Sequence, residues 1–185
     1  ATNMAYARAV IACLSYSVTG VASMKCPSSP AFVHAGVQVT ATADASCKRV
    51  KAEVQARVGG TNGWVDPHNG GIYSLLSEAA NELEVQRTTN PKTSVGGKVY
   101  TDKQIFTFTD EADGKCKIEA CSASQGFSVY DASTNYCDIH DLLCNDAVCN
   151  PIDSFTTTET EVTPKFGSGG KDPQACLPKK EHELI

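Results

Sequence analysis

Polar and apolar residues alternate through much of this chain, which is the pattern of strands with one buried face. The longest such run, Arg49–Val58, switches between polar and apolar at nine consecutive steps. Val50, Val54 and Val58 also recur every four residues, so a helix is an alternative for this segment. We predict a strand, because a helix would spread the alternating residues around its whole circumference.

Further runs follow at spacings of roughly ten residues, separated by turns rich in Gly, Pro and Asn. These runs are rich in Val, Ile, Tyr, Phe and Thr, which suit a pleated, half-buried surface. Short strands joined by short turns predict a mainly β protein, an antiparallel meander forming a small barrel or sandwich, with α+β as the alternative. The other predicted strands are Phe32–Thr42, Ile72–Ser77, Leu83–Arg87, Val99–Thr109, Cys116–Cys121 and Gln125–Tyr130.

The segment Asp131–Cys149 breaks the alternating pattern and carries three cysteines. We predict one or two helical turns here, with Asp131 or Ser133 as the N-cap. Its disulfides would hold this short helical segment against the sheet.

From Thr156 onward the chain is dominated by Thr, Glu, Gly, Pro and Lys. We interpret residues 156–185 as an extended low-complexity tail, tethered only through Cys176. The disulfide-rich β domain is then predicted to span residues 24–155.

Residues 1–23 have the layout of a secretory signal peptide. Arg8 gives a positive charge, Ala9–Gly20 is mildly apolar, and small residues precede a cleavage point after about Ser23. Two alternatives are an uncleaved membrane anchor, since about 20 residues can span a bilayer, and an amphipathic helix packed on the domain.

Nine cysteines are present, and Cys13 lies apart from the others in the apolar N-terminal stretch. The remaining even set predicts four disulfides and a secreted or lumenal, oxidising compartment. Their spacing does not choose among the possible pairings. These cysteines are Cys26, Cys47, Cys116, Cys121, Cys137, Cys144, Cys149 and Cys176.

A structural zinc site usually draws ligands in close pairs, and no Cys-x-x-Cys occurs in this chain. Cys137, His140 and Cys144 could supply three metal ligands, but disulfides are the simpler use of these cysteines. We therefore predict no metal and no cofactor.

The formal net charge is −5, and the basic residues are scattered rather than gathered in a stripe. An acidic chain of this kind argues against binding nucleic acid or an anionic membrane surface.

Two histidines have neighbours that suggest chemistry. Asp66-Pro-His68-Asn69 combines base-like residues with turn formers, so we predict that His68 orients the Asp66–Gly70 turn. Asp138 and Asp141 flank His140, but the calcium-loop pattern is missing, and we interpret this segment as a solvated acidic turn. We predict no catalytic residue.

Four motifs resemble secreted, Cys-rich hypothetical proteins of single-celled algae and related protists, over about residues 47–149. The resemblance implies an oxidising compartment and transfers no functional site. The motifs are WVDPHNxG from Trp64, YTDK from Tyr100, IEACSxSQ from Ile118 and STNYCDIHDLxC from Ser133.

These features predict a non-catalytic binding or structural protein, which could carry a small hydrophobic ligand. One alternative is an accessory subunit of a membrane or cell-surface complex. The other is a hydrolase that uses His68 or His140. For the carrier, the predicted cavity is lined by Val54, Val58, Ile105, Phe106 and Phe108.

Overall fold

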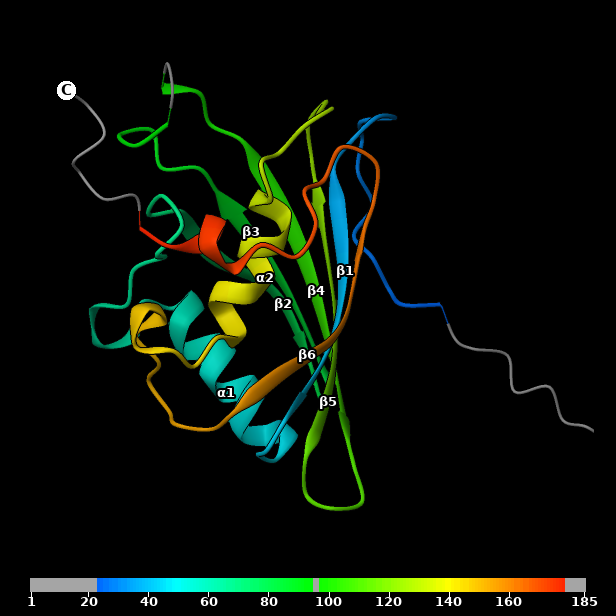
Figure 1. The fold of residues 1–185 in the computed structure, drawn as a ribbon, viewed down its shortest axis with the longest axis vertical. Helices are drawn as coiled ribbons and strands as arrows, with labels where there is room; N and C mark the ends of the chain where they lie inside the picture. Colours follow the sequence, from blue (N-terminus) through cyan, green and yellow to red (C-terminus); the bar gives the residue numbers. More distant parts are fainter. Residues whose placement is uncertain (1–22, 95–96, 179–185) are drawn as a thin grey trace, which may run out of the picture.

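The computed structural model describes residues 23–94 and 97–178, so the N-terminal predictions for residues 1–22 lie outside the described part. Within it, six strands form one antiparallel sheet in the order β2-β3-β4-β5-β1-β6. Two helices cover one face of this sheet (Figure 1). The elements are β1 (Gly36–Ala43), α1 (Cys47–Val58), β2 (Ile72–Ala79), β3 (Glu82–Thr88), β4 (Thr101–Asp110), β5 (Cys116–Ser124), α2 (Thr134–Leu143) and β6 (Thr157–Pro164).

The prediction of a mainly β, antiparallel protein is confirmed. The sheet does not close into a barrel, because β2 and β6 remain as its two edges. Neither helix of the described chain is long and apolar enough to cross a membrane.

The interpretation of Arg49–Val58 as a strand is wrong, because α1 occupies this segment. The alternating pattern depended on Ala52 and Ala56, which are not buried, whereas Glu53 and Arg57 are buried. Ala, Lys, Arg, Glu and Gln all favour helices, so local propensity agrees with the packing. The buried positions follow helical spacing: Cys47, Val50, Glu53, Val54, Arg57 and Val58.

Two further predictions need correction. Gln125–Tyr130 is a loop and not a strand; β1 pairs with β5 only as far as Ala123. The sixth strand is instead β6, within the segment interpreted as a tail held only by Cys176. Its Thr-rich sequence has strong β propensity, and it pairs with β1 from Val37 to Ala43.

All eight cysteines outside the N-terminal stretch are bridged, as predicted. Cys26 is bonded to Cys121, Cys47 to Cys116, Cys137 to Cys176, and Cys144 to Cys149.

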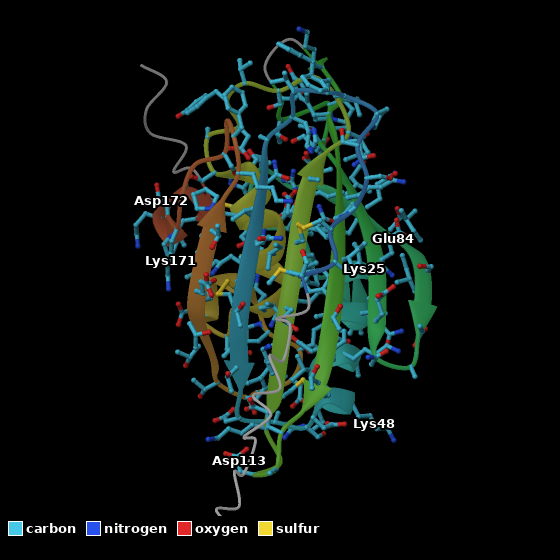
Figure 2. The ribbon with its side chains drawn as sticks, turned by 90° about the vertical axis from the view of Figure 1, so that its right-hand side faces the viewer. Lys25, Lys48, Glu84, Asp113, Lys171 and Asp172 are labelled. Atoms are coloured by element: carbon cyan, nitrogen blue, oxygen red, sulfur yellow. A yellow bond between two sulfur atoms is a disulfide. The ribbon has the colours of Figure 1, made fainter. Side chains whose placement is uncertain are left out.

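Figure 2 looks onto the face of the sheet opposite the helices, where residues before β1 cross the strands. Lys25 forms an ion pair with Glu82 on this face, with the Lys25 Nζ 2.6 Å from a carboxylate oxygen. Cys26 is bonded to Cys121 of β5 here. The N-terminal segment is therefore fastened across the middle of the sheet.

The five side chains predicted to line a cavity do not face one space. Val54, Val58, Phe106 and Phe108 pack in the core between the helices and the sheet, with exposed fractions of 0–9%. Ile105 points to the other face, because successive strand residues alternate between the two faces. The core they were expected to enclose is filled by side chains.

Candidate functional site

An open cleft of about 820 Å³ lies at one end of the sheet. Its walls are the connection between β3 and β4 and the connection between β5 and α2, both at the upper end in Figure 1. Its size lies within the ordinary range of small-molecule sites, roughly 300–1,000 Å³.

The rim of the cleft is apolar and exposed. Five large side chains on it are more than half exposed, and the two most exposed are Tyr130 at 76% and Phe127 at 73%. Such gathering of exposed apolar side chains in a small protein commonly marks a binding surface. The five are Val99, Tyr100, Phe127, Val129 and Tyr130.

The loop that carries Phe127, Val129 and Tyr130, called here the aromatic loop, is held firmly at its base by Asp131. One carboxylate oxygen accepts the backbone N–H groups of Ser133 and Gly169, and the other accepts the N–H of Asn135 and the hydroxyl of Ser168. These bonds tie the start of α2 to the chain after β6. They also hold Ser133 in the left-handed region, with φ of 67°.

Gly169 is required for this close approach. A Cβ atom at position 169 would lie 2.1 Å from the Ser133 hydroxyl oxygen and 2.8 Å from its backbone nitrogen. The Gly-rich stretch after β6 is thus packed against the aromatic loop, although its composition suggested a segment that buries little.

The floor of the cleft is polar and buried, and the sheet register builds it. Arg87 of β3 lies opposite Asp102 of β4, and Asp102 lies opposite Ser124 of β5. The three side chains form a row on the helix side of the sheet, with exposed fractions of 1%, 3% and 8%. The cleft therefore offers an apolar entrance and hydrogen-bonding groups at its base.

Burial raises the pKa of Asp102, and the nearby Asp131 carboxylate adds to this; a hydrogen bond with Ser124 and the charge of Arg87 oppose it. The folded protein thus binds the Asp102 proton more tightly than the unfolded chain does. This contribution to stability is complete below the ordinary aspartate pKa of about 3.9 and is lost as pH rises through the raised pKa.

We expect the variant Asp102→Asn not to lose this stability as pH rises, because asparagine does not titrate. Its free energy of unfolding, relative to that of the unchanged protein, should increase as pH rises from about 4 and then level off. Urea unfolding of both proteins across this pH range measures the difference. A difference independent of pH would contradict the assignment of a raised pKa to Asp102.

Beneath the floor lies a buried ionic cluster. The Arg87 guanidinium is 2.6 Å from Asp66 and 3.3 Å from Asp138. A Cβ on Gly71 would lie 2.3 Å from the guanidinium carbon, so only glycine leaves room for it. Burial alone would lower the pKa of Arg87, but Asp138 and Asp66 outweigh it and raise that pKa.

Asp138 and Asp141 do not form the solvated acidic turn that we predicted, since both are fully buried. Burial raises the pKa of both carboxyl groups. The nearby carboxyl groups of Asp66 and Asp138 add to the rise in the pKa of Asp141. Neither Asp141 carboxylate oxygen has a hydrogen-bond partner among the described residues. Asp66, by contrast, accepts N–H groups on both of its carboxylate oxygens.

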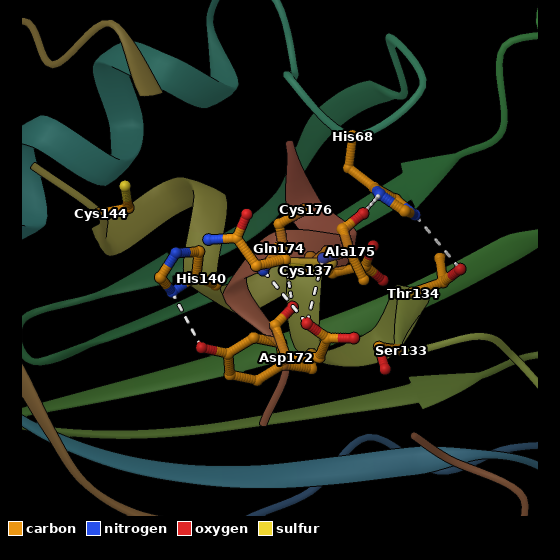
Figure 3. Close-up of a disulfide and its surroundings, with 12 residues drawn as sticks. His68, Ser133, Thr134, Cys137, His140, Cys144, Asp172, Gln174, Ala175 and Cys176 are labelled. Carbon is orange, nitrogen blue, oxygen red and sulfur yellow. Dashed lines mark hydrogen bonds between the residues drawn. A yellow bond between two sulfur atoms is a disulfide. The ribbon is translucent and has the colours of Figure 1, made fainter. Parts of the chain in front are cut away.

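His68 lies at the edge of this cluster and is 6% exposed. Its backbone N–H donates to Asp66, and its ring Nε2 lies 3.1 Å from the amide nitrogen of Asn69 in the same turn. The ring also faces the C-terminal segment (Figure 3). Ring Nδ1 donates to the carbonyl oxygen of Ala175 at 2.8 Å, and Nε2 lies 3.4 Å from the Thr134 hydroxyl. His68 therefore makes hydrogen bonds within the Asp66–Gly70 turn, in agreement with its predicted role, and also ties the turn to the C-terminal segment.

His140 lies beside an acid, as expected, but that acid comes from β6. Its Nδ1 is 2.7 Å from the Glu159 carboxylate and 3.1 Å from the Tyr136 hydroxyl. The metal set considered from the sequence does not assemble, because Cys137 is bonded to Cys176 and Cys144 to Cys149. His68 and His140 belong to separate surroundings and do not form one site.

No family model matches this chain, and no curated protein matches it. A match among the solved structures is the Zhui aromatase/cyclase from Streptomyces sp. R1128, at 14% identity and a TM-score of 0.30. The match covers 49% of this chain and 68% of that chain. A TM-score this low carries no argument about fold or function. The functional proposal below rests on the geometry of the cleft.

The sequence did not identify this cleft. Phe127 and Val129 are separated by Ser128, and together with Tyr130 they fall within a segment whose pattern predicts a strand. Arg87 and Asp102 were placed in strands without a role. Their polar side chains fall at positions where the strand pattern requires apolar ones, and this mismatch is the signal that could have marked them.

Proposed function

We propose that the protein is a non-catalytic, secreted or lumenal binding protein that carries a small, mainly apolar ligand in the cleft. The observation that supports this most directly is the exposed aromatic rim above a buried polar floor. The four disulfides fit an oxidising environment, and secretion or a lumenal location is part of the proposal.

The rim favours an apolar ligand body. Tyr130 and Phe127 expose most of their surface to water, and a flat ligand between the two walls would cover it. Burial of one aromatic side chain is favourable by about 1.5–3 kcal/mol. Aromatic rings also add a preference for stacked or edge-to-face contact with an unsaturated ligand.

The floor favours a neutral hydrogen-bonding group at the inner end of the ligand. The charge of Arg87 is already matched by Asp66 and Asp138, so it leaves little attraction for an anion. Burial favours the protonated form of Asp102, and Ser124 adds a hydroxyl. A hydroxyl or carbonyl group would find both donors and acceptors there.

The variant Tyr130→Ala is expected to bind such a ligand about 10-fold more weakly, since about 1.4 kcal/mol of lost burial corresponds to one factor of ten. Nile red, a neutral dye whose fluorescence reports a non-polar site, can serve as the probe. Fluorescence titration of the full chain gives the Kd for each protein.

Phe32→Ala is the matched control, because Phe32 is fully exposed and does not line the cleft. The proposal predicts an unchanged Kd for this variant. Equal weakening in both variants, or no saturable binding by the unchanged protein, would contradict the carrier function.

The hydrolase alternative rests on the His68 ring and the Thr134 hydroxyl, 3.4 Å apart where Thr134 lines the cleft. This separation exceeds the usual reach of a working nucleophile and base, about 2.6–3.2 Å. Ester hydrolysis that His68→Gln abolishes at an unchanged melting temperature would favour the hydrolase. Saturable dye binding without hydrolysis favours the carrier.

A further inference from the structure

The C-terminal end of α2 brings a histidine close to a disulfide. His140 lies in the last turn, Cys144 follows four residues later, and Cys149 ends a short 3-10 helix, Ala147–Cys149. One ligand atom of each of the three lies within 4.8 Å of the others. The two sulfur atoms are joined at present, with an S–S distance of 2.04 Å.

We propose that His140, Cys144 and Cys149 form a zinc site when the disulfide between the two cysteines is reduced. Zinc prefers tetrahedral nitrogen and thiolate sulfur, with bonds of about 2.0–2.3 Å and neighbouring ligand atoms about 3.5–3.8 Å apart. The imidazole nitrogen already lies within 4.8 Å of both sulfur atoms, and the sulfur atoms have to separate. Four residues between the cysteines also match the usual spacing of zinc-binding pairs.

A hydrogen bond to Glu159 orients His140 for binding a metal. Nδ1 donates its hydrogen to Glu159, at 2.7 Å, which leaves the lone pair of Nε2 available. Figure 3 shows the bonded nitrogen of His140 on the side of the ring away from Cys144. A carboxylate behind a histidine in this manner fixes the ring and increases its basicity as a zinc ligand.

The backbone on both sides of the disulfide is held by bonds that do not depend on it. Arg57 donates to the carbonyl oxygen of Cys144 at 2.7 Å, and Trp64 donates to that of Cys149 at 2.8 Å. Glu53 accepts the N–H groups of Ile152 and Asp153. Reduction would therefore free two thiols within a loop that keeps its shape.

This disulfide is also the one whose opening loosens the chain least. It joins residues five apart in sequence, whereas the other three join residues 39, 69 and 95 apart. The entropy that a cross-link removes from the unfolded chain grows with the size of the loop. An opening of about 560 Å³, lined by His140 and Cys144, gives a small reductant and zinc access to the site.

The steps balance with a dithiol as the reductant. The dithiol supplies two electrons and two protons, the S–S bond breaks, two S–H bonds form, and the dithiol becomes a cyclic disulfide. Zinc then displaces both thiol protons to solvent and forms two Zn–S bonds and one Zn–N bond. Water from the adjoining opening takes the fourth position.

The test uses the full chain in a Cys13→Ser background, treated with dithiothreitol until one disulfide is open by intact mass. Peptide mapping should identify that disulfide as Cys144–Cys149. The reduced protein should bind one Zn²⁺ in competition with a chelator, and Co²⁺ should give a thiolate charge-transfer band. The oxidised protein should show neither.

Variants separate this site from adventitious binding. His140→Gln should weaken zinc binding at least about 100-fold and Glu159→Gln about 10-fold, since outer partners of a zinc ligand contribute about 10–100-fold. His34→Gln, at a histidine outside this group, should leave the Kd unchanged.

Three results would overturn the proposal. One is reduction of another disulfide first. Another is loss of the near-ultraviolet circular dichroism before zinc binds. The last is zinc binding no tighter than that of the doubly substituted protein Cys144→Ser, Cys149→Ser, which lacks both thiols.

Discussion

Replacement of Arg87 by methionine is expected to lower the free energy of unfolding by about 3–5 kcal/mol, because it removes one partner of a buried ionic cluster. The Arg87 side chain is 2% exposed, and its Asp66 partner is completely buried. Without the guanidinium, the Asp66 carboxylate would lose its only close positive charge among the described residues. Urea unfolding of the oxidised protein near neutral pH measures the loss.

Arg49→Met provides the matched control. Arg49 pairs with Asp153 at 2.8 Å, but these two side chains are 51% and 41% exposed. Exposed ion pairs contribute little because water screens them, so this variant should unfold close to the unchanged protein. Equal losses in the two variants would show that burial does not set the strength of the Arg87 cluster.

Replacement of both Cys47 and Cys116 by alanine is expected to cost about 4 kcal/mol of stability, from the entropy of closing a loop of this size. The bridge joins residues 69 apart and fastens the start of α1 to β5. Thermal or urea unfolding in the absence of reductant gives the change.

The same pair of alanine substitutions at Cys144 and Cys149 should cost only about 2 kcal/mol, since the loop it closes is short. The comparison is matched in residue type and in the number of bridges lost. A larger loss at Cys144 and Cys149 than at Cys47 and Cys116 would contradict the loop-size argument and the expected survival of the fold after reduction.

The strands β2 to β5 could be predicted because the sequence of each one contains the signals of a strand. Turn formers such as Asn90-Pro91 and Gly114 delimit them, and alternation marks a buried face. The prediction for α1 is wrong for two reasons. Its small alanines fit the alternating pattern although they are not buried. Its buried face includes polar residues, so the apolar residues alone do not show the helical spacing. Glu53 and Arg57 lie inside because they bond each other at 2.7 Å.

The cleft could not be predicted, since no single segment contains it. Arg87, Asp102 and Ser124 become neighbours only through the register of three strands. The aromatic loop is placed by Asp131, whose partners Ser168 and Gly169 lie far along the chain. The even number of cysteines outside the N-terminal stretch did predict four disulfides, although not their pairing.

The place of β1 in the sheet has a consequence for how the protein is made. Both neighbours of β1, β5 and β6, follow it in the chain, so the strand has no partner until most of the protein has been synthesised. Non-local pairing of this kind slows folding. Cys26 and Cys47 flank β1 and are synthesised well before Cys121 and Cys116, their native partners. They would therefore meet each other first, and efficient production should require an enzyme that isomerises disulfides to undo that early non-native link.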